Sequence, residues 1–212
     1  SYELAIAIDP ELVFILGDIY FTKMHLCIWD DLASNLNELT SKVNNGEKAL
    51  NPFLALAVID NPEIQRKAAE IYANEKYPQC YVLPKIERYP KHKKIRIGYF
   101  SQDFRNHPVS DLTAELYEMH DRERFEIHAF SYGPDTEDEM NLRIKKGVDH
   151  FHELRKMSHK DAAMLARSLE IDIAVDLGGY TQDCRTEIFA MSAAPIQISY
   201  IGYLGTMGAK YY

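Results

Sequence analysis

Apolar residues recur every three or four positions along the first third of the chain, which is the spacing of amphipathic helices. The clearest stretch, residues 30–43, ends at Asn44-Asn45-Gly46. A further helix has Pro62 in its first turn and is capped by Asp60 or Asn61. Other segments with helical spacing are 2–10, 12–29 and 52–58. This region is therefore predicted to be helical.

A different pattern begins at residue 95, where short apolar runs alternate with helical stretches of about ten residues. Strands are predicted over Ile95–Phe100, Phe125–Tyr132, His150–Leu154, Ile171–Leu177 and Ile196–Ile201. Helices are predicted over Pro108–His120, Glu137–Val148, Lys160–Leu169 and Arg185–Met191. The alternation implies right-handed crossovers and a doubly wound parallel sheet, so the predicted fold class is α/β.

Prolines with interleaved charges separate the two patterns. The predicted organisation is a helical lead-in over residues 1–77, an extended connector over 78–94 and a Rossmann-like lobe over 95–212.

The composition of the 212 residues narrows the function classes. The net charge of −8 argues against a nucleic-acid partner, because phosphate binding needs a basic surface. No apolar run approaches the ~20 residues of a bilayer span, so no membrane partner is expected. Three widely spaced cysteines without zinc spacing, and no signal peptide in residues 1–10, favour a cytoplasmic protein.

Parallel sheets bind ligands beyond the carboxyl ends of their strands, so the loops at those ends are the candidates for a functional site. The first such loop holds Asp103, Asn106 and His107, followed by Pro108. His107 is predicted at a helix start, where the helix dipole favours a neutral imidazole that can accept a proton. Asp103 either orients this imidazole or pairs with Arg105. The alternative is that Asp103 and Asn106 only cap the helix.

Two later loops are rich in glycine. The pair Gly178-Gly179 precedes Tyr180 and Thr181, and paired glycines allow a ligand or another backbone to approach closely. The loop 202–208 holds three glycines and a threonine, which either cradle a phosphate or sugar or serve a tight turn. Asp176, at a predicted strand end, is interpreted as a hydrogen-bonding or ligand-facing group.

Several kinds of site are not expected. The chain lacks the Gly-x-Gly-x-x-Gly of a dinucleotide site in the first loop, and it has no Gly-x-Ser-x-Gly elbow. Asp172 and Asp176 share a strand face but stand too far apart for a metal pair, so no metal site is predicted. The remaining histidines do not cluster in the sequence and are interpreted as structural or solvated: His25, His92, His120, His128, His150, His152 and His159.

Several motifs, taken in order, resemble the catalytic region of the O-linked N-acetylglucosamine transferases, and in particular SPINDLY-like bacterial members of glycosyltransferase family 41. They are Ile97-Gly98-Tyr99-Phe100-Ser101-Gln102-Asp103-Phe104 with Asn106-His107-Pro108, Gly179-Tyr180-Thr181 with Arg185 and Phe189, Ala194-Pro195-Ile196-Gln197, and Gly202-Tyr203-Leu204-Gly205-Thr206 with Gly208-Ala209. Upstream, Met24-His25-Leu26-Cys27 with Trp29 resembles the family's helical lead-in, and residues 2–10 resemble the end of a tetratricopeptide repeat.

The resemblance implies a two-lobed GT-B enzyme preceded by tetratricopeptide repeats, in which this chain holds the lead-in and the N-terminal catalytic lobe. It implies inverting transfer of N-acetylglucosamine from the nucleotide sugar UDP-GlcNAc to serine or threonine of acceptor proteins or peptides, with no metal and no other cofactor. The C-terminal lobe, which binds the diphosphate, is expected after Tyr212, so the chain alone is expected to be inactive.

The resemblance also assigns roles to residues of this sequence. His107 and Asp103 become the catalytic candidates for proton removal. The candidates for substrate binding are Asn106, Pro108, Val109, Tyr180, Thr181, Ile201 and Gly202. Val109 stands where some members have threonine, which removes one hydroxyl contact. The alternatives are a related protein O-fucosyltransferase or N-glucosyltransferase, and a non-catalytic protein-binding module.

Overall fold

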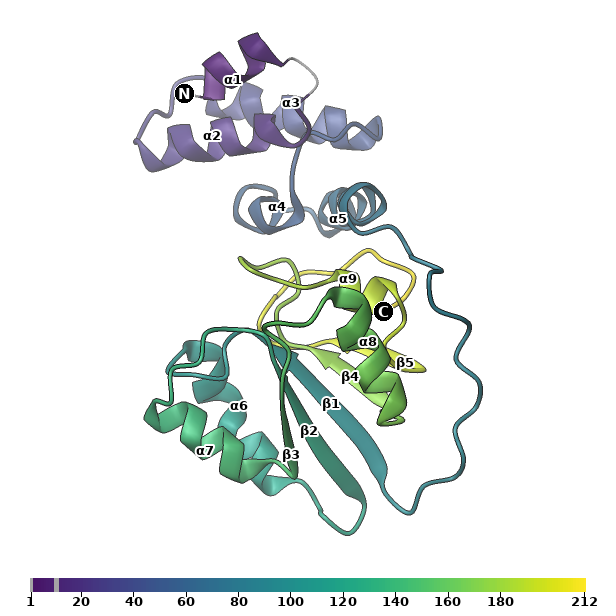
Figure 1. Ribbon diagram of the computed structural model, residues 1–212. Coiled ribbons are helices and arrows are strands. Elements are labelled where there is room, and N and C mark those ends of the chain that lie inside the picture. The colour runs from purple at the N-terminus through teal and green to yellow at the C-terminus, as the bar shows by residue number, and fades with distance from the viewer. Residues whose placement is uncertain (1, 10–11) are drawn as a thin grey trace. The chain divides into compact units, whose positions relative to one another are not determined.

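The computed structural model describes residues 2–9 and 12–212 and forms two compact units (Figure 1). The first unit comprises the chain up to Pro78 together with Gly205–Ala209. The second comprises Gln79–Leu204 together with Lys210–Tyr212.

The first unit is helical, as predicted. Its described helices are α1 (Tyr2–Ile8), α2 (Ile15–His25), α3 (Leu32–Asn44), α4 (Pro52–Val58) and α5 (Pro62–Lys76). The side chain of Asn61 caps α5 by accepting hydrogen bonds from the N–H groups of Glu63 and Ile64. The α2 helix begins later than its apolar pattern, because Phe14 has a left-handed φ of 67°. Pro10, the predicted end of the first helix, lies outside the described residues.

The second unit contains a five-stranded parallel sheet, which confirms the predicted α/β fold class. The strands are β1 (Ile95–Ser101), β2 (Phe125–Ser131), β3 (His150–Glu153), β4 (Ile173–Asp176) and β5 (Ile196–Ser199). Their order in the sheet is β3-β2-β1-β4-β5, and all four neighbouring pairs are parallel. The strand order therefore reverses between β1 and β4, which creates a crevice at their carboxyl ends.

Helices cover both faces of this sheet (Figure 1). They are α6 (Pro108–Met119), α7 (Glu139–Gly147), α8 (His159–Ser168) and α9 (Glu187–Ala190). One core lies between the sheet and α6 and α7, and includes Ile127 and Tyr117. The other lies on the side of α8 and α9, where the rings of Phe100 and Phe130 stack 4.4 Å apart. Strand side chains alternate between these two cores, as the pleat requires.

The segment that precedes β1 contains no helix or strand between residues 78 and 94. Its residues after Pro78 are hydrogen-bonded to the helices of the α/β unit. The N–H group of Cys80 donates to the carbonyl oxygen of Ala190 at 2.8 Å, and Arg167 donates to the carbonyl oxygen of Pro84 at 2.6 Å. Among the residues described, each helix falls short of the length and apolar character needed to cross a bilayer.

Candidate functional site

A cleft of about 280 Å³ lies at the carboxyl ends of the central strands, where the strand order reverses. Loops that follow β1, β4 and β5 supply its walls. The lining residues are Gln102, Asp103, Arg105, His107, Val109, Leu177, Thr181, Gln182, Asp183 and Gly202. Titratable side chains and loop backbone converge here, which makes this cleft the candidate functional site.

Two larger hollows, of about 820 and 650 Å³, are bordered by the segment that precedes β1. Arg167 is a partly buried cation in the lining of the larger hollow, and its guanidinium is already hydrogen-bonded. It donates to the carbonyl oxygens of Pro84, Met191 and Ser192 at 2.6–2.8 Å. Because these bonds fasten backbone segments together, the smaller cleft is the better candidate for chemistry.

His107 is the N-cap residue of α6, and its ring Nδ1 accepts a hydrogen bond from the N–H of Val109 at 3.2 Å. An Nδ1 atom that accepts cannot carry the ring proton, so the neutral imidazole carries it on Nε2. The His107 side chain is 34% exposed and lines the cleft. In this arrangement it presents an N–H donor, rather than a proton acceptor, to a ligand.

Asp103 is almost completely buried, and it pairs with Arg105 rather than with His107. Its Oδ1 atom accepts a hydrogen bond from Arg105 Nη2 at 3.2 Å, whereas its Oδ2 atom lies 3.7 Å from His107 Nδ1, beyond hydrogen-bond distance. The hydroxyl of Ser110 donates to the carbonyl oxygen of Asp103. The alternative in which Asp103 and Asn106 cap the helix is wrong, because His107 itself provides the cap.

Asn106 and Pro108 lie beside the cleft without lining it. The N–H group of Asn106 donates to Asp138 Oδ2 at 3.0 Å, which ties the loop after β1 to the start of α7. Desolvation opposes ionisation of Asp138, but N–H donors from Asn106 and Asn141 and the hydroxyl of Thr136 together lower its pKa. Asn106 is thus fixed through its backbone, and its side chain is exposed.

Gln102 links the two central loops, and the sequence reasoning missed it. Its Nε2 atom donates to Thr181 Oγ1 at 3.1 Å and to the carbonyl oxygen of Gln182 at 3.2 Å. The sequence signal for Gln102 was its position directly after β1 and next to the catalytic candidate Asp103. Because the amide spans from the β1 loop to the β4 loop, it fixes the width of the cleft.

The glycine pair after β4 is held by Asp176. The carboxylate is buried, and its Oδ1 accepts the N–H groups of Gly178 at 2.9 Å and Gly179 at 3.1 Å. Its Oδ2 atom accepts the hydroxyl of Tyr212. Burial raises the pKa of Asp176, although these hydrogen bonds act in the opposite direction. Asp176 therefore orders the loop, and it is absent from the cleft lining.

Replacing Asp176 by alanine is expected to lower the free energy of unfolding by about 2–4 kcal/mol, because buried N–H donors lose their acceptor. Asparagine keeps the Oδ1 acceptor, so the free energy of unfolding of Asp176→Asn is expected to be close to that of the wild type at neutral pH. Since the folded state raises the pKa of Asp176, that residue's stabilisation is greatest at low pH and is lost as the pH rises through the folded pKa. Because asparagine does not titrate, Asp176→Asn should remove this pH-dependent part of the stability. Urea unfolding at several pH values tests both points, and equal stability of the alanine and asparagine variants would refute them.

The predicted substrate-binding residues in the later loops separate into two groups. Thr181 and Gly202 line the cleft. Tyr180 is buried, with its ring 5.5 Å from that of Tyr203, and does not line the cleft. Ile201 packs against the core near α6 and has a φ of 54°, which turns the chain so that Gly202 reaches the cleft.

Gly202 has no room for a side chain. A Cβ atom placed on it would lie 1.8 Å from the carbonyl oxygen of Leu177. The backbones of the loops after β4 and β5 therefore touch at the floor of the cleft, and only glycine fits at this position.

Among the described residues, the group of side chains with metal-ligand geometry lies outside the cleft, elsewhere on the sheet.

Comparison with known proteins gives matches along most of the chain. The profile of Glycosyl transferase family 41 matches residues 71–212. The chain is 34% identical over 205 residues to an Arabidopsis thaliana protein named "Probable UDP-N-acetylglucosamine--peptide N-acetylglucosaminyltransferase SEC", covering 90% of this chain and 21% of that protein. It is 40% identical over 123 residues to the Caenorhabditis elegans "UDP-N-acetylglucosamine--peptide N-acetylglucosaminyltransferase", covering 56% of this chain and 10% of that protein. The chain thus spans about a fifth of the length of the plant relative.

A solved structure has the same fold. It is a mutant of the O-GlcNAc transferase of Thermobaculum terrenum, which matches with a TM-score of 0.70 and 22% sequence identity. The match covers 99% of this chain and 41% of that one. At this identity the likeness establishes the shared fold.

Proposed function

Because this chain belongs to glycosyl transferase family 41, and forms the N-terminal part of its catalytic region, we propose that it contributes the histidine-bearing side of an active site for protein glycosylation. The reaction is the inverting transfer of N-acetylglucosamine from UDP-GlcNAc to a serine or threonine hydroxyl of an acceptor protein. For the whole protein, we also propose further tetratricopeptide repeats, a C-terminal catalytic lobe and a cytoplasmic location.

The observation that carries this proposal is the convergence of Asp103, Arg105 and His107 at the reversal of strand order. In an inverting displacement, the acceptor hydroxyl attacks the anomeric carbon, loses its proton, and the diphosphate leaves. The chemistry rests on positioning, on an acceptor for the proton and on donors that stabilise negative charge. The cleft offers groups of each kind without requiring a metal.

We assign the proton-accepting role to Asp103 and a donor role to His107. The Oδ2 atom of Asp103 is not held by Arg105, so it is the carboxylate oxygen that can receive a proton. The Nε2–H group of His107 can donate to an oxygen of donor or acceptor, since Nδ1 is held by Val109. Thr181 and the backbone at Gly202 supply further contacts to a sugar.

A donor panel with the complete protein tests the function. The protein is incubated with a serine- and threonine-containing peptide and with UDP-GlcNAc, GDP-fucose or UDP-glucose, and peptide mass is measured. The expected result is a mass gain of one N-acetylhexosamine with UDP-GlcNAc and none with the other two donors. Transfer of fucose or glucose would redirect the proposal to a related transferase. Peptide binding without transfer from any donor would indicate a non-catalytic binding module. Reactions without peptide control for donor hydrolysis.

A further inference from the structure

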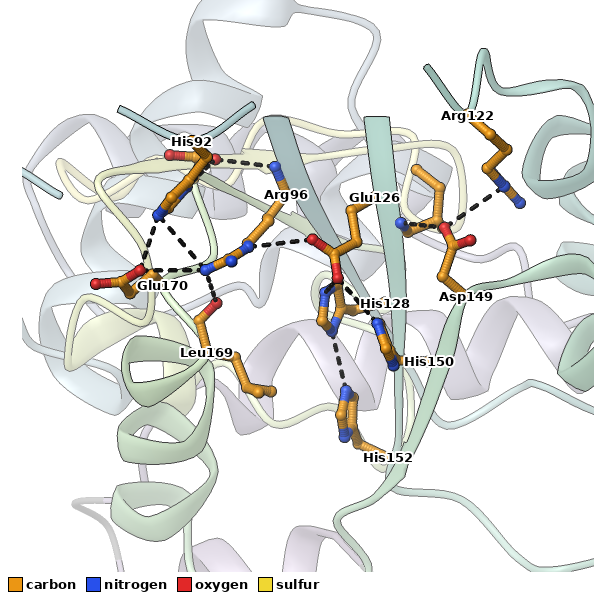
Figure 2. A network of polar contacts seen from close by, with 12 residues as sticks. His92, Arg96, Arg122, Glu126, His128, Asp149, His150, His152, Leu169 and Glu170 are labelled. Atoms are coloured by element: carbon orange, nitrogen blue, oxygen red, sulfur yellow. Dashed lines mark hydrogen bonds and ion pairs between the residues drawn. The ribbon is translucent and has the colours of Figure 1, made fainter. Parts of the chain in front are cut away.

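Three histidines and a glutamate gather on β2 and β3, outside the cleft. Figure 2 shows Glu126 and His128 of β2 beside His150 and His152 of β3. The parallel pairing of the two strands places His128 level with His150, although they are 22 residues apart in the chain. All four side chains lie on the sheet face that carries Phe130, whose ring stacks on those of His128 and His152.

Three ligand atoms converge within this cluster. The Nε2 atom of His150 lies 2.9 Å from Oε1 of Glu126, and the Nε2 atom of His128 lies 3.7 Å from the same oxygen. The three atoms lie within 4.8 Å of one another. Tetrahedral zinc with bonds of 2.0–2.1 Å holds its ligand atoms about 3.4 Å apart. The separations of 2.9 and 3.7 Å bracket this value, and closing the remaining distance requires the partly exposed Glu126 and His150 side chains to rotate.

His128 provides an independent indication of a ligand. It is 3% exposed, and its Nε2 atom has no hydrogen-bond partner. A buried imidazole nitrogen that lacks a partner is costly, because it has given up water without compensation. The unpartnered atom faces Glu126, on the side where His150 also points (Figure 2).

The surrounding side chains can orient these ligands. The Nδ1 atom of His128 lies 3.0 Å from Nε2 of His152. When His128 donates this hydrogen bond, its own Nε2 carries the lone pair that a metal needs, and the second nitrogen is fixed by an acceptor. On the other side, Arg96 Nε donates to Oε2 of Glu126 at 3.2 Å, which leaves Oε1 turned toward the imidazoles.

We propose that Glu126, His128 and His150 form a binding site for a divalent transition metal such as Zn²⁺. Two imidazoles and one carboxylate suit zinc or its neighbours better than Mg²⁺ or Ca²⁺, which prefer oxygen ligands. Three protein ligands leave a coordination position for water. The site lies on the strands themselves rather than on the loops beyond their carboxyl ends, so it is separate from the cleft. A bound ion joins the short edge strand β3 to β2.

The test is titration of Zn²⁺ into the 212-residue chain after chelator treatment, followed by competition with a chromophoric chelator. One ion is expected per chain. His150→Ala removes a half-exposed ligand without opening the core, and is expected to weaken binding by at least about tenfold, since even loss of an orienting partner commonly costs 10–100-fold. The matched control is His159→Ala, because His159 is similarly exposed and lies 3.3 Å from Glu187 but belongs to no metal-ligand group among the described residues.

Thermal unfolding supplies a second readout. Zn²⁺ is expected to raise the Tm of the wild type and of His159→Ala, because an ion that binds the folded state stabilises it. At the same Zn²⁺ concentration, the increase in Tm should be smaller in His150→Ala and Glu126→Gln, because these variants bind the ion more weakly. Equal zinc affinity in wild type and His150→Ala would overturn the proposal, as would equal stabilisation by Mg²⁺.

Discussion

Replacing His107 by alanine is expected to lower kcat/KM for glycosyl transfer by the complete enzyme by roughly 10²–10⁴-fold. The imidazole lines the cleft with its Nε2–H group available, because the N–H of Val109 occupies Nδ1. A positioned donor in a partly desolvated cleft stabilises developing charge more strongly than water does. Initial rates with UDP-GlcNAc and peptide measure the effect.

His107 also caps α6, so this prediction needs a variant that separates the two roles. Loss of an N-cap costs about 0.5–2 kcal/mol of stability. His107→Ser retains a capping oxygen but removes the imidazole. If the imidazole acts on substrate, the serine and alanine variants lose activity to the same extent, although only alanine loses stability. Recovery of activity in His107→Ser would show instead that the residue serves as a helix cap.

Replacing Gly133 by alanine is expected to destabilise the fold by about 3 kcal/mol and to reduce transfer. A Cβ atom at this position would lie 1.8 Å from the carbonyl oxygen of Gln102. The backbones of the loops after β1 and β2 are in contact here. Relieving the clash would therefore require one of the two backbones to shift, which costs more free energy than moving a side chain. Displacing Gln102 also pulls its amide from Thr181, which widens the cleft.

The control for this variant is Gly147→Ala at the end of α7. Its Cβ would lie 3.2 Å from Cγ of Glu118, a flexible side chain that can shift. Its unfolding free energy is therefore expected to stay within about 1 kcal/mol of the wild type. Urea unfolding compares the two variants, and equal midpoints would contradict the close backbone approach at Gly133.

The position of the candidate site was predictable from the sequence, whereas the contacts between its side chains were not. Apolar runs marked the ends of β1 and β4, and the doubly wound pattern placed the loops with Asp103, His107 and Thr181 at one edge of a sheet. Whether Asp103 pairs with Arg105 or with His107 depends on loop conformation over a few ångströms. Sequence spacing leaves both pairings open.

Contacts between residues far apart in the chain could not be predicted from the sequence. Gln102 reaches Thr181 across 79 positions, and no local pattern marks that bond. The same holds for His128 and His150, which are 22 residues apart in the sequence and share no local motif. The parallel register of β2 and β3 brings them level, and register is decided by the packing of whole strands.

The sequence by itself determined the helical first third, the alternation of strands and helices from β1 onward, and the loops in which polar chemistry is concentrated. These features follow from periodicity and capping, which involve residues a few positions apart. The tertiary structure alone decided the strand order, the tautomer of His107, the role of Asp176 as a loop anchor and the histidine cluster beside Glu126. The strand order and the histidine cluster depend on groups far apart in the chain, which only the packed sheet brings within bonding distance. The tautomer of His107 and the bonds between Asp176 and the glycine N–H groups depend instead on loop conformation over two or three residues, which spacing in the sequence leaves open.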